Sequence, residues 1–260
     1  MPSDSLRSTP SRPQPSQNNQ SQLGKVYLLG AGPGAMDYLT LQGKACLQQA
    51  DVLIYDALID ERLQAEVGGD CQLIHVGKRG GQPSTPQAQI NQLLIEQCRS
   101  GKQVVRLKSG DPFIFGRVSA EIQALKSAGC SFEVVPGLSS ALAAPLLAGI
   151  PLTDPVLSRG FGVFTAHDIE ALNWEALSQL PTLVLLMGGR QLGAIVQQLL
   201  SHGRSPYCPI AIIRWAGQPQ QQVVASTLEA VEQRALEQME RLSPCVIVVG
   251  EVVSLREFLQ

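Results

Sequence analysis

Residues 25–34 read KVYLLGAGPG, an apolar run that ends in a glycine-rich turn. The run Val26–Leu29 is typical of a buried β-strand, and the glycines that follow allow a tight turn. Working outward, nine further β-rich runs alternate with longer segments of helical patterning. This alternation predicts an α/β protein with largely parallel sheets.

The predicted strands form two sets of five, one on each side of Pro136–Gly137. The first set comprises Val26–Leu29, Val52–Tyr55, Gln72–Val76, Gln103–Leu107 and Phe132–Val135. The second set comprises Gly162–Thr165, Thr182–Met187, Pro209–Ile213, Gln222–Ser226 and Cys245–Val249. Helices are predicted at Leu39–Gln49, Gln87–Ser100, Ser119–Ala128 and Gly189–His202. We therefore expect a tail at 1–22 followed by two α/β domains, at 23–136 and 137–260.

Residues 1–22 consist largely of Ser, Gln, Pro and Asn, so this tail is expected to be disordered. It lacks the apolar core of a secretory signal, and its two arginines, many serines and single acid leave a transit peptide as the less favoured alternative to a plain tail. The uncharged stretch between Glu133 and Asp154 is interrupted by prolines and glycines, which a membrane-spanning helix disfavours. A cytoplasmic location without membrane contact is expected.

Composition narrows the function further. The formal net charge of −2 over 260 residues gives no overall attraction to nucleic acid. The six cysteines are too far apart for CxxC pairs, and the three histidines form no HxH or HxxxH pattern. No metal site is therefore expected.

The GAGPG turn allows two interpretations. With Ala35 it satisfies the GxGxxG/A dinucleotide pattern, and Asp56 after the second strand would be the ribose-binding acid. Pro33 argues against this interpretation because proline has no N–H to offer a pyrophosphate. The alternative is a plain tight turn.

KSGDPFIFGR, residues 108–117, follows the fourth strand directly. Gly110 would let a ligand approach the backbone at the carboxyl end of that strand, where α/β proteins bind ligands. Asp111 and Pro112 predict a helix start, with Asp111 as its cap. Asp111 is thus either a ligand contact or only a cap.

A local excess of basic residues surrounds this motif. Between His75 and Arg117 there are seven bases and two acids, a net charge of +5, whereas the whole chain has a net charge of −2. The bases are Lys78, Arg79, Arg99, Lys102, Arg106, Lys108 and Arg117. Those in glycine-rich loops, Arg79 and Arg117 among them, suit binding of a polyanionic small molecule.

Two later motifs carry weaker signals. Ser139 and Ser140 precede a helix of small residues and either cap it or bind a ligand. Met187, in LLMGGR, lines an apolar pocket or packs in the core.

Taken together in chain order, these motifs resemble the tetrapyrrole methylases over about residues 24 to 255. The motifs are GAGPG (30–34), YDALI (55–59), GKRGG (77–81), VVRLKSGDPFIFGR (104–117), EVVPGLSSALAAPLLAGIPLT (133–153), LLMGG (185–189) and SPCVIVVGEVV (243–253). The resemblance is strongest to members that methylate carbon atoms of uroporphyrinogen III.

The resemblance implies a non-Rossmann fold of two α/β domains with the active site between them, in a homodimer. It implies S-adenosyl-L-methionine as methyl donor, S-adenosyl-L-homocysteine as product, and uroporphyrinogen III as acceptor. The tetrapyrrole product would be precorrin-2, formed via precorrin-1, which leads to sirohaem and cobalamin. An acceptor with eight carboxylates agrees with the local basic residues.

Motif positions carry the family's site residues over to this chain. Asp56 and Lys78 match the proton acceptor and donor. Arg79 and Arg117 are the expected substrate-binding residues. Donor-binding residues would be Pro33, Ser109, Gly110, Asp111, Ile114, Ser139, Ser140, Met187, Ala216 and Gly217.

The chain departs from the family pattern at Ala35, Ser109, Val118–Ala120 and Asp154–Pro155. The last departure removes a basic residue on the substrate side and leaves open a related tetrapyrrole as substrate. Two alternatives of other classes also stay open: an NAD(P)-dependent dehydrogenase that uses GAGPGA with Asp56, and a non-catalytic tetrapyrrole-binding protein.

Overall fold

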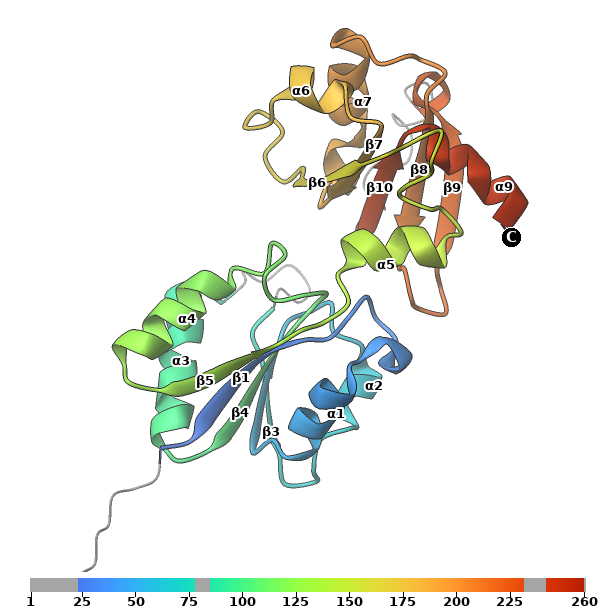
Figure 1. Cartoon of the computed structure of the whole chain (residues 1–260). Helices are drawn as coiled ribbons and strands as arrows, with labels where there is room; N and C mark the ends of the chain where they lie inside the picture. The colour runs from blue at the N-terminus through green and yellow to red at the C-terminus, as the bar shows by residue number, and fades with distance from the viewer. Residues whose placement is uncertain (1–22, 78–84, 232–241, 260) are drawn as a thin grey trace, which may run out of the picture.

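The computed structural model describes residues 23–77, 85–231 and 242–259. Figure 1 shows two groups of elements, each built on one β-sheet. We call the first sheet with helices α1–α4 the N-terminal lobe, and the second sheet with helices α5, α6, α7 and α9 the C-terminal lobe. The predicted tail of residues 1–22 lies outside the described residues.

The N-terminal lobe is an α/β sandwich around a parallel sheet with strand order β3-β2-β4-β1-β5. Its strands are β1 (Lys25–Gly30), β2 (Val52–Tyr55), β3 (Gln72–His75), β4 (Gln103–Lys108) and β5 (Ser131–Val135). Helices α1 (Leu41–Gln48) and α2 (Glu61–Gln64) pack on one face. Helices α3 (Gln87–Arg99) and α4 (Val118–Ser127) pack on the other. All five carboxyl strand ends therefore lie along one edge.

The C-terminal lobe is built on a mixed sheet with order β6-β7-β10-β8-β9. Its strands are β6 (Phe161–Thr165), β7 (Thr182–Leu186), β8 (Pro209–Arg214), β9 (Gln222–Thr227) and β10 (Cys245–Val249). Helices α6 (Trp174–Ser178) and α7 (Leu192–Ser201) cover one face. Helix α5 (Ser140–Leu147) and the 3₁₀ turn Glu251–Leu255 cover the other, and α9 (Arg256–Leu259) follows that turn.

The ten predicted strands are all present, each within one residue of its predicted ends. The prediction of largely parallel sheets is confirmed for the first sheet and wrong for the second. Only β6 and β7 pair in parallel there, because β8 and β9 form a hairpin and β10 enters antiparallel between β7 and β8. Composition identifies a strand but carries no information on its direction.

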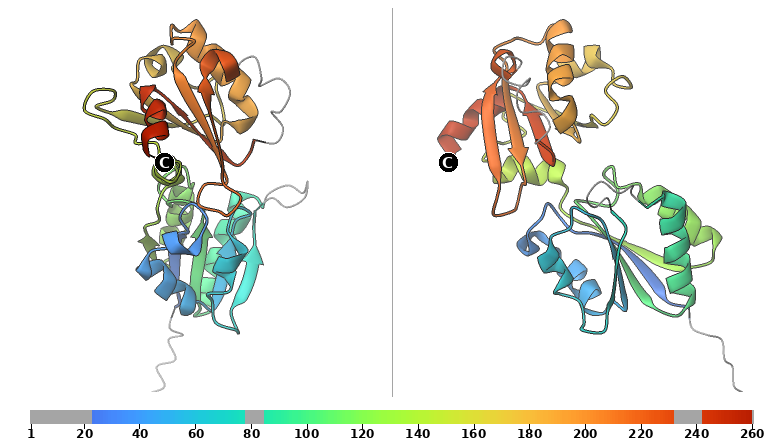
Figure 2. Two further views of the ribbon diagram at one scale, coloured as in Figure 1. Left: turned by 90° about the vertical axis from the view of Figure 1, so that its right-hand side faces the viewer. Right: turned by 180° about the vertical axis from the view of Figure 1, so that it is seen from behind.

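The direction of these strands decides which loops face the N-terminal lobe. Because β7 and β8 both run antiparallel to β10, their carboxyl ends lie at the same edge. The β8–β9 loop leaves this edge and reaches the N-terminal lobe, where the Ala35 N–H donates to the Gly217 carbonyl at 3.1 Å. Both views of Figure 2 show this orange loop next to the N-terminal lobe.

None of the helices in the described part of the chain has the length and apolar character needed to cross a bilayer. The same residues include no group of three or more His, Cys, Asp or Glu side chains placed to hold a metal ion.

Candidate active site

The site lies where the strand order of the first sheet reverses. Neighbouring strands β1 and β4 lead to helices on opposite faces of the sheet, α1 and α4 respectively. Such a switch point leaves a crevice outside the carboxyl ends of the two strands, where open α/β sheets bind ligands. The GAGPG turn follows β1 and the SGDP segment follows β4.

The glycines of these two loops allow the backbones to pack against each other. Gly32 and Gly110 exchange backbone hydrogen bonds of 3.2 and 2.9 Å. A Cβ atom on Gly30 would lie 2.6 Å from the Cα atom of Gly137, in the loop after β5. Three strand-end loops are therefore joined into one floor beneath the crevice.

Asp111 closes this floor through both of its carboxylate oxygens. One accepts from the Phe113 N–H at 2.8 Å and the other from the Gly137 N–H at 3.2 Å. The predicted helix start at Asp111–Pro112 is wrong, because α4 begins only at Val118. Asp111 instead caps a turn, which continues through Phe115 and Arg117 with φ of 54° at both residues.

The structure brings the predicted donor-binding residues together in two groups. In the first group, Gly110 faces the start of α5: a Cβ atom there would lie 3.6 Å from Ser140 N. Ser139 caps α5, since its hydroxyl accepts from the Ala141 N–H at 3.3 Å. Ser109 and Ile114 are exposed beside this group.

The second group joins the two lobes. A Cβ atom on Gly217 would lie 3.2 Å from Cγ of Pro33, so the GAGPG turn packs on the β8–β9 loop. Ala216, next to Gly217, is half-buried there. The described structure thus places Pro33, Ala216 and Gly217 side by side.

Met187 and Trp215 add backbone strain at the facing edge of the C-terminal lobe. They directly follow β7 and β8, with φ of 60° and 50°, in a region that non-glycine residues rarely adopt. Met187 is 50% exposed, so the core-packing alternative for it is wrong. Strained residues of this kind concentrate at ligand-binding segments.

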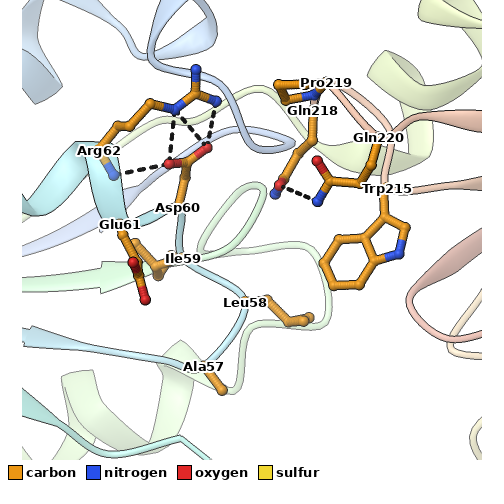
Figure 3. A pocket seen from close by; sticks show the side chains of 10 residues that line it. All are labelled: Ala57, Leu58, Ile59, Asp60, Glu61, Arg62, Trp215, Gln218, Pro219 and Gln220. Atoms are coloured by element: carbon orange, nitrogen blue, oxygen red, sulfur yellow. Dashed lines mark hydrogen bonds and ion pairs between the residues drawn. The ribbon is translucent and has the colours of Figure 1, made fainter.

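A cavity of about 390 Å³ opens between the lobes (Figure 3). Its lining comes from the loop and helix start after β2 and from the β8–β9 loop: Ala57, Leu58, Ile59, Asp60, Glu61, Arg62, Trp215, Gln218, Pro219 and Gln220. Asp60 and Arg62 form an ion pair of 2.7 Å, which lowers the pKa of the Asp60 carboxyl. The cavity is therefore lined by apolar side chains, by the Asp60–Arg62 ion pair and by the polar side chains of Glu61, Gln218 and Gln220.

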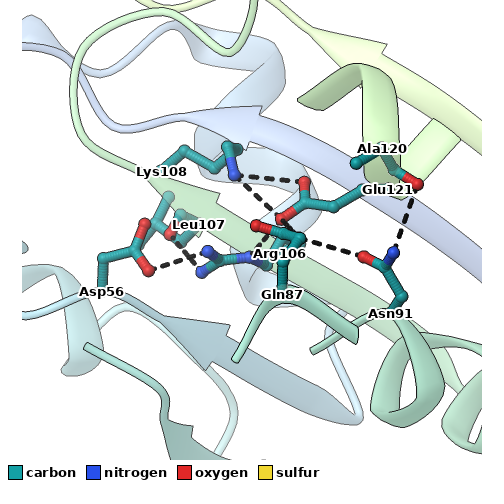
Figure 4. A network of polar contacts seen from close by, with 8 residues as sticks. All are labelled: Asp56, Gln87, Asn91, Arg106, Leu107, Lys108, Ala120 and Glu121. Atoms are coloured by element: carbon teal, nitrogen blue, oxygen red, sulfur yellow. Dashed lines mark hydrogen bonds and ion pairs between the residues drawn. The ribbon is translucent and has the colours of Figure 1, made fainter. Parts of the chain in front are cut away.

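Asp56 is the first residue of the loop after β2 that lines this cavity. It belongs to a network of ion pairs (Figure 4). Its Oδ1 accepts from Nη2 of Arg106 at 2.7 Å. Nε of Arg106 donates to Glu121 at 3.1 Å, and Lys108 donates to both oxygens of Glu121 at 2.9 and 3.1 Å. Burial and the adjacent Arg106 charge lower the pKa of Lys108. Asp56 is 34% exposed, whereas the other three charges are buried.

Comparison with known proteins identifies the family of the chain. The sequence model of the Tetrapyrrole (Corrin/Porphyrin) Methylases matches residues 25–232, most of the chain. The chain belongs to the tetrapyrrole methylase family.

Individual proteins of this family are similar to this chain over about nine tenths of its length. A uroporphyrinogen-III C-methyltransferase of Synechococcus elongatus is 63% identical over 235 residues, which is 90% of this chain and 96% of that protein. The uroporphyrin-III C-methyltransferase of Thermus thermophilus in complex with S-adenyl homocysteine superposes with a TM-score of 0.77 at 36% identity, covering 89% of this chain and all of that one. A siroheme synthase of Baumannia cicadellinicola is 43% identical over 91% of this chain, which spans 52% of that longer protein.

The tetrapyrrole methylase geometry argues against the dinucleotide alternative. The N–H groups of Ala31, Gly32 and Ala35 are bonded to the carbonyls of Lys108, Gly110 and Gly217. Pro33 has no backbone N–H group, so this turn has few free hydrogen-bond donors for a pyrophosphate. The turn also leads into a 3₁₀ turn at Met36–Tyr38 rather than into the start of an α-helix.

The predicted basic excess is reduced in three dimensions, because two of the seven bases are buried in ion pairs. Arg106 and Lys108 are buried in β4 and paired with Asp56 and Glu121, two acids that flank the counted stretch. Arg117 is exposed at the start of α4. Lys78 and Arg79 lie outside the described residues, so their predicted roles stay predictions.

The sequence interpretation missed Arg106 and Glu121 as parts of the site. A signal was present, because Arg106 and Lys108 alternate on one face of a strand that is otherwise apolar. Two charges on a face that packs against helices require a buried counter-ion. Only the fold identifies that counter-ion as Glu121.

Proposed function

We propose that this tetrapyrrole methylase transfers methyl groups from S-adenosyl-L-methionine to carbon atoms of uroporphyrinogen III, giving precorrin-2 via precorrin-1. The single observation that carries the proposal is the 63% identity to a uroporphyrinogen-III C-methyltransferase along nearly its full length. The neighbour in complex with S-adenyl homocysteine supports the choice of donor. The product would feed sirohaem or cobalamin synthesis.

The residues of the crevice fit the donor. The positive φ of 71° at Gly110, with no heavy atom nearer than 3.6 Å to a Cβ placed there, leaves space between this residue and Ser140. Pro33, Ala216 and Gly217 form the opposite group, and the half-exposed Met187 supplies an apolar surface. When bound, the donor supplies an electrophilic methyl group on a sulfonium centre.

The protein's own task is alignment and proton handling. The electron pair of a pyrrole carbon forms the new C–C bond while the S–C bond breaks, so no covalent intermediate with the enzyme is needed. Holding both partners in line replaces an encounter in solution by a positioned reaction. Asp56 then accepts the proton that the methylated, cationic ring must lose. Arg117 and Arg79 would bind acceptor carboxylates, and Lys78 would donate a proton.

The related-tetrapyrrole alternative has one observation in its favour. Asp154 stands where the family has a basic motif, and its carboxylate accepts from the N–H groups of Val156 and Leu157 at 2.8 and 2.9 Å. Both bonds lower the pKa of Asp154. The Asp154 carboxylate is therefore bonded within its own turn, at a motif position where the family has a basic side chain.

A mass spectrum of the products decides between these substrates. Incubation with uroporphyrinogen III and S-adenosyl-L-methionine should give a species with two added methyl groups. Failure with uroporphyrinogen III, together with methylation of a tetrapyrrole carrying fewer carboxylates, would establish the alternative. A thermal shift with NADH but not with S-adenosyl-L-homocysteine would contradict both.

We further propose that the enzyme is a cytoplasmic homodimer whose two domains divide at Pro136–Gly137. The family resemblance favours the dimer, and α5 exposes Leu142 and Leu146 by 46% and 72% on one helix face. A second copy covering this face would bury them. Light scattering of a Leu146→Glu variant should then show a monomer, and an unchanged mass would count against this face.

A further inference from the structure

The interior of the N-terminal lobe holds three buried charges: Arg106, Lys108 and Glu121. They are the only buried Asp, Glu, Lys or Arg residues in the part of the chain that the structure describes. Burying charges is costly, and a buried ion pair is often no more stabilising than apolar residues of the same volume. A contribution to stability alone is therefore a weak reason for this cluster.

The cluster leads from the interior to the crevice. Arg106 lies level with Ile54 of the neighbouring strand β2, and its side chain reaches past the end of that strand to Asp56. Arg106 is 3% exposed and Asp56 is 34% exposed. The ion pair thus joins a buried cation to a partly exposed carboxylate at the carboxyl end of β2.

The contacts fix the carboxylate at one oxygen. Oδ1 of Asp56 accepts from Arg106 at 2.7 Å, whereas Oδ2 makes no hydrogen bond to any residue that the structure describes. A guanidinium is planar, so its orientation sets the plane in which it meets a carboxylate. Oδ2 is the atom left to accept a proton.

Glu121 holds the guanidinium at its other end. Its Oε1 accepts from Nε of Arg106 at 3.1 Å, and Lys108 and Gln87 donate to the same carboxylate. The two cations and two anions balance. The bond to Glu121 therefore fixes the position of the Arg106 guanidinium. The position of the Asp56 carboxylate is set by its bond to that guanidinium.

We propose that Arg106 is a positioning residue for Asp56, and that Glu121 fixes Arg106 for this purpose. This inference rests on the proposed function, in which Asp56 accepts the proton released after methyl transfer. In this role Arg106, which is 3% exposed, acts only by directing Oδ2 of Asp56 into the crevice.

The variant Arg106→Met tests the proposal. It leaves Lys108 and Glu121 as a complete buried pair and releases Asp56. Displacement of a catalytic group by about 1 Å reduces rates by about 100-fold, so kcat should fall on that scale. KM for uroporphyrinogen III and affinity for S-adenosyl-L-homocysteine should stay near wild type. Arg106→Lys keeps the charge but loses the planar fork, and should recover part of the rate.

A double-variant cycle excludes a merely structural effect. If Arg106 acts through Asp56, Arg106→Met should add almost nothing to the loss caused by Asp56→Asn. If the double variant loses kcat by the product of the two single losses, the proposal is overturned. An Arg106→Met enzyme with wild-type kcat would overturn it as well. If Arg106→Met fails to fold, the same cycle with Arg106→Lys decides between the two outcomes.

A control removes an ion pair at the opposite end of the sheet. Lys25→Met breaks the Lys25–Glu133 pair of 2.6 Å, which is partly exposed, and should leave kcat unchanged. A wild-type protein that does not methylate uroporphyrinogen III would overturn the proposed function and this inference with it. An inactive Asp56→Asn beside a fully active Arg106→Met would overturn this inference alone.

Discussion

The two lobes have similar numbers of elements but different interiors. The N-terminal lobe buries Arg106, Lys108 and Glu121, whereas the buried polar residues of the C-terminal lobe are hydroxyls such as Thr182 and Ser158. The first sheet is fully parallel and presents all its carboxyl strand ends to the crevice; the second is mixed and presents strained loops. In the proposed function, the first lobe handles the proton and both lobes shape the ligand site.

The largest effect on stability is expected when the charge balance of the N-terminal lobe is broken. Glu121→Leu leaves Arg106 and Lys108 buried with Asp56 as the remaining anion, and the free energy of unfolding should fall by about 3–5 kcal/mol. Urea unfolding measures this loss. A change below about 1 kcal/mol would show that the two lobes do not differ in this respect.

The equivalent change in the C-terminal lobe should be smaller. Thr182 donates to the Ser158 hydroxyl at 2.7 Å, and Thr182→Val removes this bond with little change in volume. The expected loss is about 1 kcal/mol, the usual net contribution of a hydrogen bond. The same urea titration applies, and a loss equal to that of Glu121→Leu would remove the contrast.

A comparison of Gly110 with Gly129 separates the effect of a side chain on ligand binding in the crevice from the effect of backbone strain on stability. Both have φ near 70°, but a Cβ on Gly129 would meet no atom within 4 Å, at a site after α4. Each Gly→Ala change should cost a similar amount of stability, about 1 kcal/mol, because both place alanine in the left-handed region. Only Gly110→Ala should weaken binding of S-adenosyl-L-homocysteine, measured by calorimetry. Equal affinities in the two variants would mean that the donor does not approach Gly110.

The smallest effect concerns the Asp60–Arg62 pair beside the inter-lobe cavity. The pKa of Asp60 is lowered in the folded protein from its ordinary value of 3.8, chiefly by the bond from Arg62. Its stabilising contribution is therefore present above pH 3.8 and is lost as the pH falls through the folded pKa. Arg62→Met should reduce stability only slightly at pH 7, because the pair is solvent-screened, and have less effect at pH 3. An effect that grows toward low pH would contradict this sign.

The sequence predicted the strands well because each is a short run of β-branched and aliphatic residues bounded by turn residues. It did not predict the direction of β10 or the β8–β9 hairpin, since pairing depends on packing between distant segments. Asp111–Pro112 was misinterpreted as a helix start because an Asx turn uses the same residues as a helix cap. The candidate site residues came largely from motifs, whereas Arg106 appeared only in a local count of basic residues, which does not distinguish buried from exposed side chains.

The central claim, that the carboxylate of Asp56 handles the proton while other residues hold the donor, is tested most directly by Asp56→Asn. The variant should retain wild-type affinity for S-adenosyl-L-homocysteine, while its kcat with uroporphyrinogen III falls by about 10²–10⁴-fold. The amide has the shape of the carboxylate but accepts no proton. An Asp56→Asn enzyme that keeps its maximal rate and loses affinity for its cofactor would contradict the account.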